Sequence, residues 1–203
     1  MLVDLSELSP NKIYHTFIQT IIPRPIAWTI TDNGDGSLNL APFSYFNGLS
    51  SNPPLVTISI GKKPDGSKKD TWVNIEERSH FVANIAHREL AEKVTASAAS
   101  LPHGESELEK LGLETAEIEG CPLPRLKQAR IAFVCEKHQI IEVGDTPQGL
   151  VIGRVRYVYV DDSVAEVNDG RMSVDPAKVD PLGRIGGNDY ALFGETITVE
   201  RPK

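Results

Sequence analysis

Two long stretches of β-forming residues constrain the fold of this chain more than any other feature. Residues 128–144 (QARIAFVCEKHQIIEVG) and 148–162 (QGLVIGRVRYVYVDD) are rich in Val, Ile, Tyr and Phe, and the segment DTPQG connects them. β-Branched and aromatic runs on both sides of a short connection that contains Gly and Pro are typical of a β-hairpin. The chain is therefore predicted to form an antiparallel sheet around this hairpin.

Shorter elements are expected before and after the hairpin. Strands are expected at residues 25–31, 37–43, 54–60, 79–86 and 196–200, and short helices at 72–78, 87–100 and 106–114. Asp70 or Thr71 is the expected N-cap of the first helix, and residues 164–190 read as a loop rich in Gly, Pro and Asp. Six or seven strands with two or three helices predict a mainly antiparallel barrel with short helical insertions. No composition shift marks a boundary, so residues 1–203 are expected to form a single domain.

Composition and charge narrow the class of protein. The 203 residues are 40% hydrophobic and 24% charged, which suits a globular protein with a core. The formal net charge of −7 argues against general binding to nucleic acid or to an anionic membrane. Acidic residues occupy the N-terminus where a signal peptide needs basic ones, and no run of 18 apolar residues occurs. A cytoplasmic protein with two reduced thiols, Cys121 and Cys135, is expected.

Several stretches of the sequence resemble known motifs but lack residues that those motifs require. GKKPDGSK (61–68) resembles a phosphate loop, but its Ser and Lys are in reversed order and no long helix follows. DNGDG (32–36) lacks the flanking acids of a calcium loop, which favours a hairpin turn. The histidines have no HExxH or CxxC companion, so no metal site is expected. Ser44 and Ser50 lie outside any GxSxG elbow, which argues against a hydrolase.

A cluster of lysines is more informative. Four lysines fall within eight residues and are opposed only by Asp65; they are Lys62, Lys63, Lys68 and Lys69. A solvated loop is the simplest interpretation of such a cluster. However, the cluster ends at Asp70-Thr71, where a helix is expected to begin, and a helix N-terminus offers unpaired N–H groups and a positive dipole end. Lys69 and Thr71 are therefore predicted to bind a phosphate-sized anion.

A second unusual stretch precedes the lysines. Residues 39–61 read NLAPFSYFNGLSSNPPLVTISIG, and serines, an Asn, a Gly and two aromatic residues crowd its first half. Asn47 can both donate and accept hydrogen bonds, and Gly48 allows close approach of the backbone. A ligand with a phosphate at one end and a flat polar heterocycle at the other fits this arrangement. FMN is such a ligand.

These residues resemble those of the flavin reductase-like family, the FMN-binding split-barrel proteins that include flavoredoxin. Five stretches carry the resemblance, in the family's order: IPRPIAW (22–28), NLAPFSYFNGLSSNPPLVTISIG (39–61), KDTWVNIEERSHFVANI (69–85), the GD turn with GLVIGRV (144–155), and RIGGNDYALFGE (184–195). The resemblance implies a six-stranded antiparallel split β-barrel that binds FMN near the interface of a homodimer.

The resemblance also implies which residues contact FMN. The loop from Ala41 to Ser51 would surround the flavin ring, and Ser59, Lys69 and Thr71 would lie toward the phosphate. The expected cofactor-binding residues are Arg24, Pro42, Phe43, Ser44, Asn47, Ser59, Lys69, Thr71 and Tyr190. Structural roles stay open for some: Ser59 as an outward strand residue, Asn47 as a turn residue and Tyr190 as a core residue. No catalytic residue is expected, because the flavin supplies the chemistry.

Two hypotheses about activity remain open. In the first, the protein is an oxidoreductase that passes electrons from NAD(P)H through FMN to free flavin, a metal complex or a protein partner. In the second, it is a non-enzymatic FMN carrier of the flavoredoxin type that a protein partner reduces. Many short members of the family resemble one another in a Gly-Asp-His turn tied to nicotinamide binding, whereas this chain has Gly144-Asp145-Thr146. Thr146 slightly favours the carrier.

Overall fold

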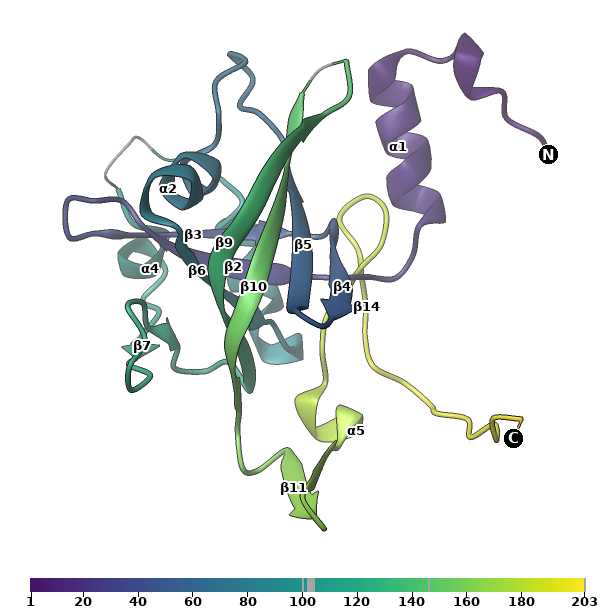
Figure 1. Ribbon diagram of the computed structural model, residues 1–203. Coiled ribbons are helices and arrows are strands. Elements are labelled where there is room, and N and C mark those ends of the chain that lie inside the picture. Colours follow the sequence, from purple (N-terminus) through teal and green to yellow (C-terminus); the bar gives the residue numbers. More distant parts are fainter. Residues whose placement is uncertain (100, 102–104, 146, 203) are drawn as a thin grey trace.

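A seven-stranded sheet forms the centre of the computed structural model, which describes residues 1–99, 101, 105–145 and 147–202. The strand order is β3-β2-β6-β9-β10-β5-β4, and every neighbouring pair is antiparallel (Figure 1). The strands are β2 (Ala27–Asp32), β3 (Leu38–Phe43), β4 (Phe46–Ser51), β5 (Pro54–Ile60), β6 (His80–Ile85), β9 (Ile131–Val143) and β10 (Gln148–Val160). The predicted mainly antiparallel fold is confirmed, with seven strands in place of six.

Strands β9 and β10 form the predicted hairpin, with 13 residues in each strand. They pair from Gln148 opposite Val143 to Val160 opposite Ile131. The register shifts twice, once between Ile152 and Gly153, and such irregularities increase the local twist of a sheet. A Cβ atom at Gly153 would lie 2.3 Å from the ring of Phe81, so the long hairpin passes this ring only because position 153 is Gly.

The sheet closes on itself through a very short connection. Strands β3 and β4 are its opposite edges, yet only Ser44 and Tyr45 connect them. Successive Cα atoms are about 3.8 Å apart, so the three steps from Phe43 to Phe46 span at most ~11 Å. The two edges must therefore approach each other, and the sheet curls into a barrel that stays open beside this connection. The Ser59 N–H donates to the carbonyl of Tyr45 at 2.9 Å and holds the connection against β5.

Short helices and strands surround the barrel. The helices are η1 (Leu5–Glu7), α1 (Pro10–Thr20), α2 (Asp70–Arg78), η2 (Arg88–Leu90), α3 (Ala91–Ala96), α4 (Glu107–Lys110) and α5 (Pro176–Val179). The remaining strands are β1 (Arg24–Pro25), β7 (Thr115–Ala116), β8 (Arg125–Leu126), β11 (Ala165–Asn168), β12 (Arg171–Val174), β13 (Gly183–Arg184) and β14 (Tyr190–Ala191). None of the helices in the described ranges is long and apolar enough to cross a membrane.

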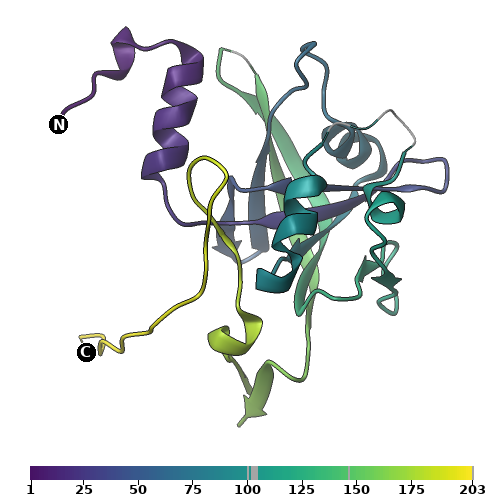
Figure 2. The same ribbon diagram turned by 180° about the vertical axis from the view of Figure 1, so that it is seen from behind.

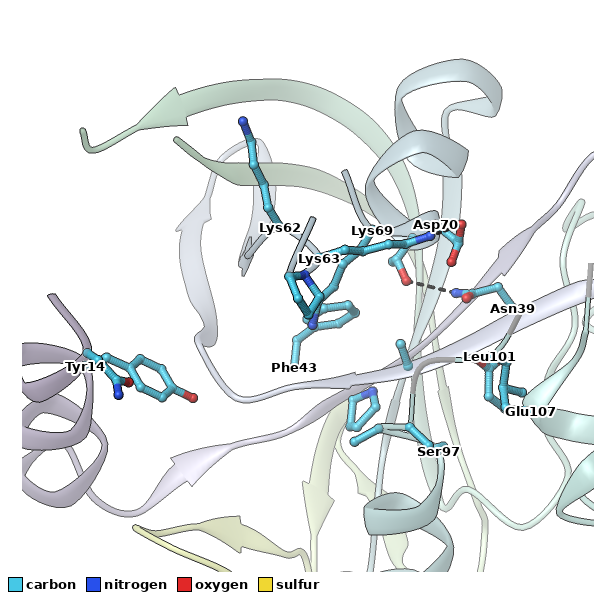
Figure 3. A pocket seen from close by; sticks show the side chains of 17 residues that line it. Tyr14, Asn39, Phe43, Lys62, Lys63, Lys69, Asp70, Ser97, Leu101 and Glu107 are labelled. Atoms are coloured by element: carbon cyan, nitrogen blue, oxygen red, sulfur yellow. Dashed lines mark hydrogen bonds and ion pairs between the residues drawn. The ribbon is translucent and has the colours of Figure 1, made fainter. Parts of the chain in front are cut away.

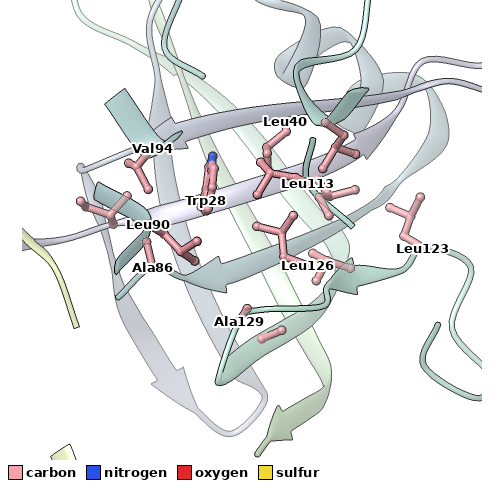
Figure 4. Packing of buried hydrophobic residues seen from close by; sticks show 14 of the residues in the cluster. Trp28, Leu40, Ala86, Leu90, Val94, Leu113, Leu123, Leu126 and Ala129 are labelled. Carbon is pink, nitrogen blue, oxygen red and sulfur yellow. The ribbon is translucent and has the colours of Figure 1, made fainter. Parts of the chain in front are cut away.

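Two hydrophobic clusters lie on the two faces of the curled sheet. The inner cluster fills the barrel, where Trp72 and Ile75 of α2 pack against buried strand residues such as Phe81 and Val151. The outer cluster centres on Trp28, and α3 and α4 cover it with residues such as Val94 (Figure 4). Strand β5 shows the expected alternation, because Val56, Ile58 and Ile60 are buried and its other residues are not. Both clusters hold β2 and β3, the strands that form one wall of the site.

Helix α1 differs from the other α-helices because it has no buried residue. Figures 1 and 2 show it beside the sheet, with its C-terminal end near the loop that precedes β14. At that end Gln19 lies directly on Gly186, where a Cβ atom would come within 2.1 Å of the Gln19 side chain. This helix was not expected from the sequence, although Ser9 followed by Pro10 is a common helix start.

Several local predictions were wrong. Residues 46–51 form β4 rather than a loop, because they pair with β5 from Phe46 opposite Ile58 to Ser51 opposite Pro54. Residues 196–200 form no strand, since they find no partner and Ile197 and Val199 stay exposed. Helix α2 begins at Asp70 with Lys69 as its N-cap. The helix expected over 87–100 is only the short pair η2 and α3, and the region 164–190 contains five short elements rather than loop alone.

Candidate functional site

A cavity of about 710 Å³ opens where the barrel is split, between β3, the N-terminus of α2, α1 and the segment after α3 (Figure 3). A second cavity of about 320 Å³ adjoins it along β5 and the Ser44-Tyr45 connection. The two share five lining residues, which are Tyr14, Pro42, Phe43, Lys62 and Lys69. We therefore treat them as one elongated site with two ends.

The lysine cluster divides into paired and unpaired side chains. Lys63 forms an ion pair with Asp70 at 2.9 Å, and Lys68 forms one with Glu76 at 2.7 Å. Lys69 lines both cavities and makes no ion pair within the described part of the chain. Burial lowers the pKa of its ammonium group, because desolvation disfavours the charged form. A partly buried ammonium without an ion pair, on a cavity wall, has the charge and position that an anion requires.

Helix α2 begins next to Lys69, which is its N-cap. The N–H groups of Trp72 and Val73 donate to the Lys69 carbonyl at 2.9 and 3.1 Å, whereas the first N–H groups of a helix have no acceptor inside it. Thr71, the second residue, is buried but lines the larger cavity. Its Oγ1 accepts a hydrogen bond from Asn39 Nδ2 at 2.9 Å, the bond marked beside Asn39 in Figure 3. The Thr71 hydroxyl proton is then available to a ligand in the cavity.

Asn39 also lines the site, although it is not among the residues expected from the sequence. It lies on β3 two residues before Ala41 and four before Phe43, so all three share one face of the strand. Both N–H bonds of its amide are used, one toward Thr71 and one toward Thr31 Oγ1 at 3.2 Å. This leaves its carbonyl oxygen as an acceptor on the wall of the larger cavity. The two-residue period could have indicated Asn39 once Phe43 was assigned to the site.

Glu107 contributes a buried carboxyl to the same cavity. Strand β3 is an edge of the sheet, and α4 covers its free backbone groups: Ser106 Oγ donates to the Leu38 carbonyl at 2.6 Å, and the Leu40 N–H donates to Glu107 Oε2 at 2.9 Å. Burial raises the pKa of Glu107, and the nearby Asp70 acts in the same direction. No local sequence signal indicated this contact, because 67 residues separate its two partners.

Neutral polar groups line the smaller cavity in addition to the shared Lys62 and Lys69. Ser44 and Ser59 both line it, as does Gln148 at the start of β10. Ser59 Oγ donates to Gln148 Oε1 at 3.1 Å, and Ser44 Oγ accepts from Arg24 Nε at 3.3 Å. Together with the aromatic face of Phe43, these groups suit a flat heterocycle with polar edges.

Six of the nine expected binding residues line the two cavities: Pro42, Phe43, Ser44, Ser59, Lys69 and Thr71. The structure places the other three elsewhere. Arg24 is buried and its Nη1 donates to the carbonyls of Ile18 and Ile21 at the end of α1. Asn47 is exposed on β4, and its Oδ1 accepts from the Gly48 N–H at 2.8 Å.

Tyr190 lies on β14, where its hydroxyl bonds to that of Thr95 at 2.8 Å and the guanidinium of Arg184 stacks on its ring. Arg24 still supports the site, because it links α1 to Ser44. Thr146, which bears on nicotinamide binding, lies outside the described residues. Within the described residues no cluster of His, Cys, Asp and Glu is arranged to hold a metal ion.

Residues 19–175 match the family described as "Flavin reductase like domain". The chain belongs to the flavin reductase-like family. This match covers β2 through β12, including both cavities except the part lined by α1.

Solved structures agree with this assignment. The chain is similar to nitrilotriacetate monooxygenase component B from Bacillus cereus, with 33% identity, a TM-score of 0.90 and 98% of each chain covered. It is similar to the 2-nitrobenzoate 2-nitroreductase NbaA of Pseudomonas fluorescens, with 27% identity, a TM-score of 0.88, and 100% and 96% covered. A protein with a split barrel domain from Shewanella frigidimarina, 22% identical, has a TM-score of 0.84 over 98% and 96% of the two chains. The predicted split-barrel fold is confirmed.

The position of Glu107 predicts a pH-dependent stability. Burial raises its pKa in the folded state above the unfolded value of about 4.3. The folded state then holds the proton more tightly, so Glu107 stabilises the fold least once the pH has risen above its folded pKa. Glu107→Gln keeps an acceptor for Leu40 and does not titrate. Its free energy of unfolding relative to the native chain should therefore rise as the pH is raised from the unfolded pKa of about 4.3 through the higher folded pKa of Glu107.

Urea unfolding at a series of pH values measures this difference. Glu109→Gln, an exposed change on the same helical turn, is the matched control and should show no such trend. A difference between Glu107→Gln and the native chain that stays constant with pH would contradict the assignment.

Proposed function

We propose that this protein binds FMN in the two joined cavities and acts as an NAD(P)H-dependent oxidoreductase. The observation that carries the proposal is the unpaired, partly buried ammonium of Lys69 beside the N-terminus of α2, in a chain of the flavin reductase-like family. An acidic protein gains nothing from such a charge unless an anion neutralises it. The phosphate of FMN is an anion of the required size and charge.

The two ends of the site differ as the two ends of FMN do. Lys69, Thr71 and the first turn of α2 would hold the phosphate, through charge and N–H donors. The carbonyl oxygen of Asn39 would accept from the sugar-like hydroxyl chain. Phe43, Ser44 and Ser59 would hold the ring, through an aromatic face and two hydroxyls. The combined cavities are large enough for such a ligand.

The protein's part in the reaction is binding, orientation and exclusion of water. Bound FMN supplies transfer of a hydride or of single electrons. Pro42 and Phe43 are the last two residues of β3, at the open side of the barrel. They form a fixed wall, because β3 is paired to β2 along its length. Ser44 is held by Arg24, and Ser59 is held by Gln148, so both hydroxyls have set positions before a ligand arrives. No protein acid or base is assigned a role.

The electron acceptor divides the proposal into two forms. The similarity to a monooxygenase component and to a nitroreductase supports an enzyme whose acceptor is free flavin, a metal complex, a small organic oxidant or a protein partner. The second candidate is an electron carrier of the flavoredoxin type, which Thr146 favours. Both operate in a reducing compartment such as the cytoplasm, where Cys121 and Cys135 stay free thiols.

We also propose that two copies form a dimer. Helix α1 buries none of its residues in the protomer, and four large apolar side chains at this helix and its C-terminal end are exposed: Tyr14, Phe17, Ile21 and Ile22. Tyr14 also lines both cavities, so a partner that covers α1 would sit next to the site. A helix of 11 residues has little stability in water without packing, which supports a partner on this face.

Removing the Lys69 charge should weaken binding of FMN but not of riboflavin. Lys69→Ala is expected to cost roughly 1.5–3 kcal/mol of FMN binding, the range for a hydrogen bond to a charged group. Lys68→Ala is the matched control, since its ammonium pairs with Glu76 and it lines neither cavity. Fluorescence titration of each flavin measures the affinities. Equal weakening of both flavins by Lys69→Ala would exclude Lys69 as a phosphate ligand.

Anaerobic reduction separates the enzyme from the carrier. If the protein is an enzyme, NADH or NADPH should bleach the absorbance of bound FMN near 450 nm within seconds, a rate in the ordinary range of enzyme turnover of about 1–1,000 per second. If it is a carrier, the flavin should stay oxidised with both nucleotides and be reduced by dithionite. A protein that remains colourless after incubation with FMN and gel filtration would contradict both forms.

The dimer is tested by sedimentation velocity. At micromolar concentration the sedimentation of the native chain should correspond to twice the mass of the protomer. Phe17→Glu should shift the equilibrium toward monomers, because it places a charge in the apolar contact. Glu7→Gln, on the exposed turn before α1, should have no effect. A native chain that stays monomeric across this range would refute the proposed interface.

A further inference from the structure

A chain of buried polar side chains leads from the C-terminal end of α2 to the phosphate end of the site. Thr31, Asn39, Thr71 and Asn74 are all at least 94% buried. Strand pairing places Thr31 directly opposite Asn39, and the three-residue spacing on α2 places Thr71 and Asn74 on one face of the helix. Buried polar side chains destabilise a fold unless each of them forms hydrogen bonds.

Arg78 begins the chain and sets the orientation of Asn74. A guanidinium can only donate hydrogen bonds, and Arg78 Nη2 donates to Asn74 Oδ1. The amide nitrogen of Asn74 must therefore face away from Arg78, where it donates to Asn33 Oδ1 at 2.9 Å and to Thr31 Oγ1 at 3.0 Å. Arg78 is itself fixed, because its Nε donates to the Asp32 carbonyl at 2.7 Å.

Asn39 connects Thr31 to Thr71 on the wall of the cavity. Its amide nitrogen donates to Thr31 Oγ1 at 3.2 Å and to Thr71 Oγ1 at 2.9 Å. Thr71 Oγ1 therefore accepts a hydrogen bond from Asn39, and the hydroxyl proton of Thr71 can be donated to a ligand in the cavity. If the Asn39 amide were reversed, Thr71 would donate its proton to Asn39 and present lone pairs to the anion. The direction of one hydrogen bond thus decides whether Thr71 attracts or repels a phosphate.

We infer that Asn39, and behind it Asn74, are positioning residues that hold the Thr71 hydroxyl as a donor toward the phosphate of the bound flavin. They act through Thr71 rather than by their own contact with the phosphate. The inference rests on the proposed binding of FMN and adds the origin of the preference for FMN over riboflavin. It assigns that preference to Thr71 together with a buried network, in addition to the charge of Lys69.

A double-mutant cycle in the 203-residue chain tests this inference. The quantity measured is the ratio of riboflavin to FMN dissociation constants, from fluorescence titrations. Thr71→Val removes the hydroxyl and should lower this ratio at least tenfold, as expected for a hydrogen bond to a charged group. Asn39→Leu keeps the shape but removes the donor, and should lower the ratio roughly three- to tenfold. In the Thr71→Val background, Asn39→Leu should change the ratio by less than about twofold.

Asn74→Leu supplies a second variant outside the cavity. It should lower the ratio in the same direction as Asn39→Leu, and its effect should also vanish in the Thr71→Val background. Asn84→Leu is the matched control, because Asn84 is equally buried on β6 but bonds Trp28, Val82 and Leu126 and lines neither cavity. Its ratio should equal that of the native chain, even if its stability falls.

The outcomes separate the inference from the function on which it rests. The positioning role would be overturned if Asn39→Leu weakened the binding of both flavins by the same factor. It would also be overturned if Asn39→Leu changed the ratio as much in the Thr71→Val background as in the native chain. Neither result would contradict FMN binding itself. If Asn39→Leu does not fold, the Asn74→Leu cycle decides by the same criteria. A native chain that binds FMN no more tightly than riboflavin would refute the proposed phosphate site, and the inference would fall with it.

Discussion

The two-residue connection between β3 and β4 is the constraint on which the site depends. It joins the opposite edges of a seven-stranded sheet, so the adjoining ends of those edges must meet, although β3 and β4 do not pair with each other. The barrel therefore closes at Ser44 and Tyr45 and stays open beside them. Both cavities lie at this opening, and the residues that lead into the connection, Pro42 and Phe43, line both. A fully paired barrel of this size would have only side chains at its centre.

Charge pairing then gives the opening its chemical character. Four lysines lie close together in the sequence, and acidic side chains neutralise Lys63 and Lys68, while Lys69 on the cavity wall makes no ion pair with the described residues. Burial raises the pKa of the Glu107 carboxyl in the same cavity, because desolvation disfavours its charged form. The larger cavity is lined by Lys62, Lys63 and Lys69 against Asp70 and Glu107, so its wall is more positive than the net charge of −7 suggests.

The sequence predicted the elements whose signals are local. The β9–β10 hairpin, the alternation in β5 and the helix after the lysines follow from composition and periodicity over a few residues. Lys69 and Thr71 could be selected because a helix start and a charge cluster coincide. Arg24 and Asn47 were assigned to the site because they lie in matching motifs, yet the structure directs Arg24 to the carbonyls at the end of α1 and Asn47 to solvent. Sequence position alone does not show which way such side chains point.

The remaining features depend on contacts between distant segments. Strand β4 has no alternating pattern, and its pairing with β5 follows from closure of the sheet rather than from its own residues. Helix α1 has the common start at Ser9-Pro10, but the described part of the chain fully buries none of its residues. Glu107 reaches Leu40 across 67 residues, and Asn74 reaches Thr31 across 43. Such partners become visible only when the fold is known.

Several of these distant contacts are made by the single strand β3. On its edge, the Leu40 N–H is held by Glu107, and from its inner face Asn39 reaches Thr71. At its end Phe43 leads into the connection that closes the barrel. A shift of β3 by one residue would reverse its faces, turn Asn39 into the outer hydrophobic cluster and break all three contacts at once. The strand is therefore held in a single register, which is why one short segment can place groups for both ends of a long ligand.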